Sequence, residues 1–144
     1  MRSKKKYKVS LTENLKNKLL YWSKKFEEVV WLDSNDKNNF SNSSKYTAIL
    51  AVDAFTALKT DSYQAFKKLE DYQTNTNDWV FGYLTYDLKN DIEFLKSSNF
   101  DGLHFPDLYF FQPKRIFLFT NTGVEIQYLN CIEEELVTDW EDIL

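Results

Sequence analysis

The densest group of side chains that could do chemistry is a trio of acids, Asp87, Asp91 and Glu93. Paired carboxylates can bind a metal ion or transfer protons to a substrate. The sequence offers no histidine and no further acid at ligand spacing around this trio, and Lys89 and Lys96 lie close by. We therefore interpret the three acids as caps and surface charges, and we predict no metal ligands here.

The only histidine and the only cysteine could each take part in catalysis. His104 would need a nucleophile and an orienting acid, and the sequence has no Gly-x-Ser-x-Gly or similar motif. We expect His104, next to Phe105 and Pro106, to be structural or solvated. Cys131 has no evident base beside it, so we expect it to be inert. The sequence thus predicts no catalytic residue.

Aromatic residues make up 17% of the sequence and include a band that could stack on a sugar or on single-stranded nucleic acid: Tyr109, Phe110, Phe111, Phe117 and Phe119. Only Lys114 and Arg115 add positive charge to this band, and the net charge of the chain is −4. We therefore expect the band to pack in a core, and we expect no nucleic-acid partner. The tryptophans expected in the core are Trp22, Trp31 and Trp79.

The first element that must position these residues is an amphipathic helix over residues 10–27. Ser10 and Glu13 form a capping-box pattern, in which the hydroxyl and the carboxylate satisfy each other's backbone amides. The apolar side chains of this stretch recur at spacings of four, three and four and so share one face: Leu15, Leu19, Trp22 and Phe26.

The remaining pattern is mostly that of strands. We predict a second helix at 61–72, an exposed loop at 33–44, and an irregular or partly helical stretch at 85–104 with a turn at Asp101 and Gly102. We predict a short buried strand at 29–32 and further strands at 46–52, 79–84, 107–112, 115–120 and 124–129, the last two joined by a turn at 121–123. Pro113 and Lys114 separate two of these strands. Gly82 inside a strand indicates a bulge or a close backbone approach, and we favour backbone packing over ligand contact. The sum predicts an α+β fold, with a largely antiparallel β-sheet and two or three packed helices.

Composition sets the class of the protein. A chain of 144 residues predicts a single domain. A single cysteine excludes an internal disulfide and fits a cytoplasmic protein. No apolar run is long enough to span a membrane, and the basic start, Arg2 with Lys4, Lys5 and Lys6, lacks the apolar stretch of a signal peptide. We expect this start to be a solvated tail.

The C-terminal segment looks incomplete. Thr138 before Asp139 is the N-cap pattern of a helix that the chain does not finish. The chain then ends on two apolar residues, Ile143 and Leu144, at a place where disorder is usual. We interpret this as a cut through a longer polypeptide.

Four short segments together resemble a known family. They are Trp31-Leu32-Asp33-Ser34, Ser43-Ser44-Lys45-Tyr46, Val80-Phe81-Gly82-Tyr83-Leu84-Thr85-Tyr86-Asp87-Leu88, and Phe105-Pro106-Asp107-Leu108. In this order they resemble the N-terminal domain of chorismate-utilising enzymes, the anthranilate synthase component I family. The amino-acid sequence from Phe81 to Glu93 resembles para-aminobenzoate synthase component I more than it resembles anthranilate synthase. The former enzyme is also called aminodeoxychorismate synthase component I.

The resemblance implies a supporting role for residues 1–144. Family enzymes carry their chemistry, and the acids that bind Mg²⁺, on a C-terminal domain whose motifs are absent here, and a glutamine amidotransferase subunit supplies ammonia. The implied partners are therefore the chain's own catalytic domain and that subunit, and the implied pathway is para-aminobenzoate and folate biosynthesis. Alone, the chain should be inactive. Two alternatives remain open: the same domain of anthranilate synthase, in tryptophan biosynthesis, and a stand-alone module that binds a small molecule or a partner.

The resemblance also implies a ligand pocket. Some family members bind tryptophan there, as feedback inhibitor or structural ligand, and the matching residues are Ser34, Ser43, Ser44, Lys45 and Tyr46. A strand-end hydroxyl and backbone groups can hold the ammonium and carboxylate of an amino acid, while apolar walls take the indole. Lys45 stands where the family often has arginine. A lysine meets the ligand carboxylate as a point charge and cannot form the bidentate hydrogen bonds of an arginine.

Overall fold

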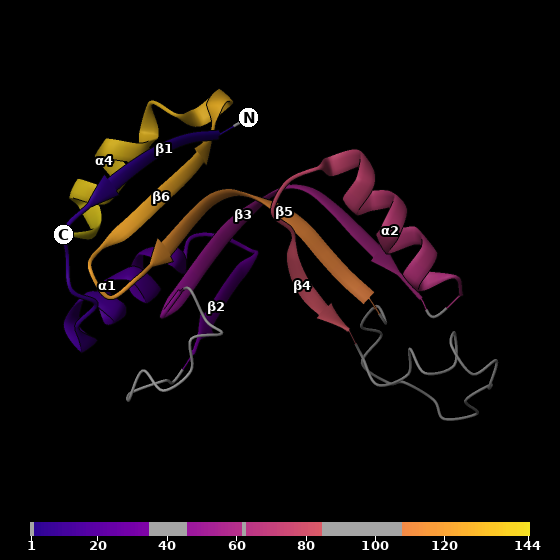
Figure 1. Ribbon diagram of the computed structural model, residues 1–144, viewed down its shortest axis with the longest axis horizontal. Helices are drawn as coiled ribbons and strands as arrows, with labels where there is room; N and C mark the ends of the chain where they lie inside the picture. Colours follow the sequence, from indigo (N-terminus) through magenta and orange to yellow (C-terminus); the bar gives the residue numbers. More distant parts are fainter. Residues whose placement is uncertain (1, 35–45, 62, 85–107) are drawn as a thin grey trace. The chain divides into compact units, whose positions relative to one another are not determined.

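A computed structural model describes residues 2–34, 46–61, 63–84 and 108–144. It is α+β, with a largely antiparallel sheet of six strands in the order β1-β6-β5-β3-β2, and β4 also pairs with β5 (Figure 1). The elements are β1 (Arg2–Tyr7), α1 (Glu13–Ser23), β2 (Val29–Asp33), β3 (Ala48–Thr60), α2 (Ala65–Thr76), β4 (Phe81–Leu84), β5 (Leu108–Phe119), β6 (Val124–Leu129), a 3₁₀ turn η2 (Asn130–Ile132) and α4 (Glu135–Ile143). The predicted class is confirmed.

The chain forms two compact units. The first contains Met1–Asp53 and Lys114–Leu144, and the second is Ala54–Pro113. The long strands β3 and β5 contribute a segment to each unit. Each unit has its own cluster of buried apolar side chains.

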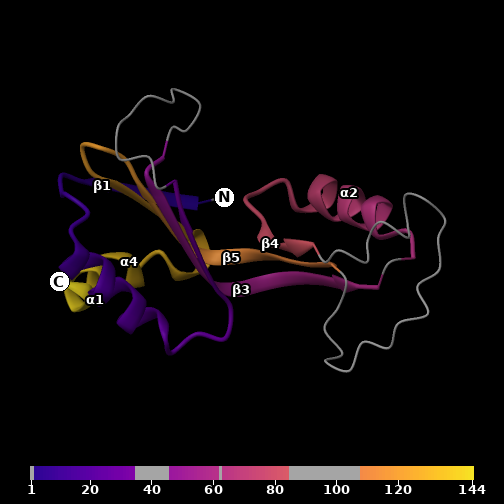
Figure 2. The same ribbon diagram turned by 90° about the horizontal axis from the view of Figure 1, so that it is seen from below.

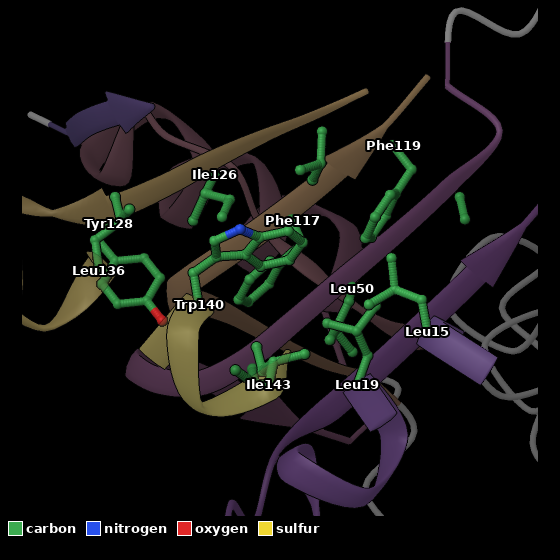
Figure 3. Close-up of a cluster of buried hydrophobic side chains, with 13 residues drawn as sticks. Leu15, Leu19, Leu50, Phe117, Phe119, Ile126, Tyr128, Leu136, Trp140 and Ile143 are labelled. Carbon is green, nitrogen blue, oxygen red and sulfur yellow. The ribbon is translucent and has the colours of Figure 1, made fainter. Parts of the chain in front are cut away.

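In the first unit, α1 and α4 cover one face of the sheet (Figure 2). Figure 3 shows the side chains that meet there from both helices and from alternate positions of the strands, as the two-residue period of a strand requires. The fully buried members include Leu19, Leu50, Phe117, Phe119 and Ile126. The predicted core face of the first helix and the core position of the Phe117 and Phe119 rings are confirmed.

In the second unit, α2 packs on the strand segments that belong to it. Ala65 and Leu69 of the helix meet Leu108 and Phe110 of β5 and Leu58 of β3. In the paired strand β4, a Cβ atom on Gly82 would lie 1.8 Å from the carbonyl oxygen of Tyr109. The predicted close approach of the backbone at this glycine is therefore confirmed.

The first helix is shorter than predicted and begins at a different residue. It spans Glu13–Ser23, and Thr12 is its N-cap, with a hydroxyl that accepts a hydrogen bond from the amide of Leu15 at 3.1 Å. The predicted capping box from Ser10 to Glu13 is wrong. Val9 and Leu11 pack against the core, which keeps the chain extended past Ser10.

The basic N-terminal segment is a strand, and the prediction of a solvated tail is wrong. Residues of β1 pair with β6 from Arg2 opposite Leu129 to Tyr7 opposite Val124. The ring of Tyr7 stacks on Trp140 with centroids 5.3 Å apart, which gives the segment a core contact. The lysine side chains at positions 4–6 are exposed, so the predicted exposure of these three side chains is confirmed.

Strand β5 runs without a break through Pro113, whereas we predicted two strands separated at this point. Proline lacks an N–H group and is tolerated in a sheet where no neighbouring strand requires that group. Here β4 pairs with residues 108–111 of β5, and β6 pairs with residues 115–119. Pro113 lies between these two registers, so its missing N–H group costs no hydrogen bond to β4 or β6.

Two other helices differ from their predicted bounds. Helix α2 starts at Ala65 rather than at position 61. Asp61 precedes it, and its carboxylate accepts a hydrogen bond from the backbone amide of Tyr63. Helix α4 starts at Glu135, so Thr138 is inside it and is not its N-cap. The predicted hairpin of β5 and β6 is present, and so is the predicted strand at 29–32. This strand was expected to be buried, which is wrong: β2 is the edge strand of the sheet, and Val29 is 38% and Leu32 50% exposed.

No helix in the described part of the chain is long and apolar enough to cross a membrane. Several sequence candidates lie outside the described residues. They are the acids Asp87, Asp91 and Glu93, the histidine His104, and the proposed turn at Asp101 and Gly102.

Candidate functional site

Ser34, the first predicted ligand residue, lies where two strands of the first unit meet. It follows the last residue of β2, and its amide donates a hydrogen bond to the carbonyl oxygen of Thr47 at 3.1 Å. Thr47 in turn donates its own amide to the carbonyl oxygen of Phe119, at the end of β5. The first bond holds the backbone amide of Ser34 next to Thr47, while Ser34 itself is exposed.

A cleft of about 550 Å³ opens beside Ser34. It is lined by Ser10, Leu11, Thr12, Glu13, Lys16, Asp33, Ser34, Thr47, Thr120 and Asn121. Its volume is in the range of small-molecule sites. The lining carries both charges: Glu13 and Asp33 are acidic, and Lys16 lies with its Nζ 4.0 Å from a carboxylate oxygen of Asp33.

This arrangement suits a zwitterionic amino acid better than an uncharged apolar ligand. The acids can accept an ammonium group, while Lys16 and the Ser34 hydroxyl can donate to a carboxylate. The ammonium of Lys16 also lies 5.6 Å from the centroid of the Trp31 ring. Leu11 is the one aliphatic side chain among the described lining residues, so apolar walls are few here.

Tyr46 lies at a second cavity in the same unit. This cavity measures about 830 Å³ and is lined by Lys6, Tyr7, Lys8, Tyr46, Thr120, Thr122, Gly123, Val124 and Glu125. Thr120 lines both cavities. The structure therefore brings Ser34 and Tyr46 to neighbouring cavities, and Ser43, Ser44 and Lys45 lie outside the described residues.

Sequence reasoning missed a buried ion-pair cluster around Arg115. Its guanidinium donates to Asp53, to Glu135 at 3.1 Å and to Asp139 at 3.2 Å. The Tyr128 hydroxyl donates to Asp139 at 2.7 Å. The cluster joins β3, β5, β6 and α4. The side chains of Arg115 and Asp139 are only 8% and 12% exposed, whereas that of Glu135 is 48% exposed.

The electrostatics of this cluster favour a fixed charge on Arg115. Burial acts to lower the pKa of Arg115, but Tyr128, Asp53 and Asp139 outweigh burial and raise it above the ordinary value. Burial and the hydrogen bond to Asp139 raise the pKa of Tyr128 far above its usual range. Arg115 and Tyr128 therefore keep their protons across the physiological range, which suits a structural role.

One signal in the sequence could have revealed the cluster. Arg115, Phe117 and Phe119 alternate along one strand, so they share a face, and the two aromatic residues are fully buried. An arginine on a core-facing position requires carboxylate partners. Glu135 and Asp139, four residues apart, are such a pair on one helix face.

Among the described residues, no group of three or more histidine, cysteine or acidic side chains is arranged to hold a metal ion. No model of a known protein family matches the chain, and no curated protein matches it either.

Proposed function

We propose that this chain is the N-terminal, non-catalytic domain of an aminodeoxychorismate synthase component I. With a glutaminase subunit, that enzyme converts chorismate and ammonia to 4-amino-4-deoxychorismate, the precursor of para-aminobenzoate and folate. In this proposal the chain supports the catalytic domain and frames a pocket for an amino acid, tryptophan being the expected ligand. The finer assignment of the fold to the chorismate-utilising class belongs to the same proposal.

The supporting observation is the way in which the described ends of the four resembling segments lie in the structure. The first segment ends at Ser34, which bonds to Thr47 directly after the second segment. The third segment includes β4, whose Leu84 is opposite Leu108, the last residue of the fourth segment. The described ends of the segments thus lie together in two pairs, Ser34 beside the residue that follows Tyr46 and Leu84 opposite Leu108. Such pairing is what a shared framework requires of motifs that are far apart in sequence.

In this function, the reaction of chorismate takes place in the catalytic domain and not in residues 1–144. Mg²⁺ and the residues that react with chorismate would belong to the catalytic domain, and ammonia would come from the glutaminase. The cleft beside Ser34 supports the ligand part of the proposal, because its polar lining complements both ends of an amino acid.

The deciding experiment is disruption of the gene in its own organism, followed by growth on minimal medium. The expected result is a requirement for para-aminobenzoate that tryptophan and anthranilate do not relieve. Rescue by anthranilate or tryptophan would establish the anthranilate synthase alternative instead. Growth without any of the three compounds would remove both enzyme assignments and favour a stand-alone binding module.

A second measurement tests the non-catalytic role directly. Purified chain of 144 residues, incubated with chorismate, Mg²⁺ and ammonium, should form no aminodeoxychorismate. The matched control is an authentic aminodeoxychorismate synthase under the same conditions. Product formation by the chain alone would overturn the proposal.

A further inference from the structure

The second cavity of the first unit, of about 830 Å³, has more positive than negative groups in its lining. Lys6 and Lys8 line it, and Glu125 is the one acid among its described lining residues. The Glu125 carboxylate already accepts a hydrogen bond from the side-chain amide of Gln127 at 3.0 Å. Lys6 and Lys8 take part in none of the ion pairs found in the described part of the chain. Two ammonium groups therefore lie at this cavity without a carboxylate of their own.

The backbone between the two lysines is held by two contacts. The ring of Tyr7 stacks on Trp140 with centroids 5.3 Å apart. In addition, a Cβ atom on Gly123 would lie 2.2 Å from the carbonyl oxygen of Tyr7. A glycine permits such a close approach of two backbone segments. It therefore brings the turn between β5 and β6 next to the segment that carries the lysines.

That turn supplies hydroxyl groups to the same cavity, since Thr120 and Thr122 both line it. The Thr120 hydroxyl donates to the carbonyl oxygen of Gly123 at 3.3 Å and accepts the amide of Thr122 at 3.4 Å. The Thr122 hydroxyl can then donate its proton either to Thr120, 3.3 Å away, or to a ligand. Because ammonium groups only donate hydrogen bonds, the cavity suits a ligand that only accepts them.

We propose that this basic cavity binds a small molecule that carries a phosphate monoester group. Such a group has a charge of about −1.5 to −2 at pH 7 and three acceptor oxygens, and lysine is a common phosphate ligand. It therefore matches two lysines and a hydroxyl, whereas a single carboxylate would leave one positive charge unmatched. The cavity volume is in the range of sites for organic ligands.

The inference goes beyond the proposed enzymatic role and does not depend on it. The binding is assigned to Lys6 and Lys8, which do not line the cleft beside Ser34.

The test is an amide NMR titration of the ¹⁵N-labelled chain with phenyl phosphate. The largest shifts should fall on residues 6–8 and 120–125. The double variant Lys6→Met with Lys8→Met should stay folded, because both side chains are exposed. It should bind phenyl phosphate about tenfold or more weakly, since it loses both charge-assisted contacts. Benzoate, which carries a carboxylate on the same ring, should bind the wild-type chain more weakly than phenyl phosphate.

The matched control is the double variant Lys4→Met with Lys5→Met. It removes the same charge from the same strand, and both residues are exposed and outside the lining of the cavity. Salt screens exposed charges beyond about 8 Å, so its affinity for phenyl phosphate should stay within about threefold of the wild-type value. Equal losses in the two double variants would mean that the basic strand attracts anions without a defined site, and they would overturn the proposal. Benzoate binding as tight as that of phenyl phosphate, or no amide shift with either compound, would overturn it as well.

Discussion

The Tyr128 hydroxyl donates a 2.7 Å hydrogen bond to Asp139, and both residues are buried. This bond joins the last strand of the sheet to the C-terminal helix, next to a guanidinium that bonds to the same carboxylate. A phenol in this setting stays protonated, because burial disfavours its charged form and ionising it would place a second negative charge beside Asp139. The relationship has a consequence for stability at high pH.

Above pH 10, the free energy of unfolding should fall more steeply in the wild-type chain than in Tyr128→Phe. The unfolded phenol ionises near pH 10, whereas the folded one has a raised pKa and keeps its proton. The unfolded state then binds fewer protons, so stability is fully present below pH 10 and falls as the pH rises. The extra slope can reach about 1.4 kcal/mol per pH unit. Urea unfolding between pH 9 and 11 measures it.

The control for this prediction is Tyr21→Phe, because Tyr21 is 75% exposed. Its slope should match that of the wild-type chain. Equal slopes for the wild-type chain and Tyr128→Phe would contradict the role assigned to burial of the phenol.

Replacement of Thr12 by alanine should destabilise the chain by about 1 kcal/mol, the usual effect of losing an N-cap. The reason is that the amide of Leu15 would lose its side-chain acceptor. Ser10→Ala is the matched control, because Ser10 precedes the cap, and its effect should stay within about 0.5 kcal/mol. Chemical denaturation of both variants measures the difference. A larger loss for Ser10→Ala than for Thr12→Ala would restore the capping box expected from sequence.

Gly82→Ala should be among the more damaging single-atom additions in the second unit. The new Cβ would meet the backbone oxygen of Tyr109 at 1.8 Å, and backbone cannot rotate away as a side chain can. Overpacking of this kind costs about 1–3 kcal/mol. Tyr83→Phe, at the next position of the same strand and 39% exposed, is the control and should be nearly neutral. Thermal unfolding of the two variants compares them, and equal melting temperatures would contradict the close approach.

Elements with strong local patterns could be predicted from sequence, and elements that depend on distant partners could not. The apolar face of α1 and the hairpin of β5 and β6 are encoded in adjacent residues, so periodicity was enough. Strand β1 is rich in lysine, and its pairing depends on β6, more than 100 positions away. Local propensity carries no information on such a partner.

The difference between local patterns and distant partners also applies to the side chains of the candidate site and of the Arg115 cluster. Ser34 could be singled out because it belongs to a contiguous motif at a strand end. The partners of Arg115 come from positions 53, 128, 135 and 139, and only the folded chain brings them together. In the aromatic band from Tyr109 to Phe119, the sequence showed Arg115 only as one of two positive charges. In the folded chain, Arg115 is the centre of the ion-pair cluster.

Tryptophan should bind the chain at the cleft beside Ser34 and raise its melting temperature as the ligand concentration increases. The hydroxyl of Ser34 can donate to the ligand carboxylate, and a hydrogen bond to a charged group contributes about 1.5–3 kcal/mol. Ser34→Ala should therefore weaken binding about tenfold or more in calorimetry. Ser3→Ala is a suitable control, because Ser3 bonds to Asn130 and Glu133, outside the residues that line the cleft.

Alanine and indole, each carrying one part of tryptophan, separate the zwitterion contacts from the ring contacts. Since the described lining is mostly polar, alanine should retain a measurable part of the affinity and indole should not. Binding of indole without alanine would move the ligand to another surface of the chain, and the absence of heat and thermal shift with all three compounds would remove the small-molecule function.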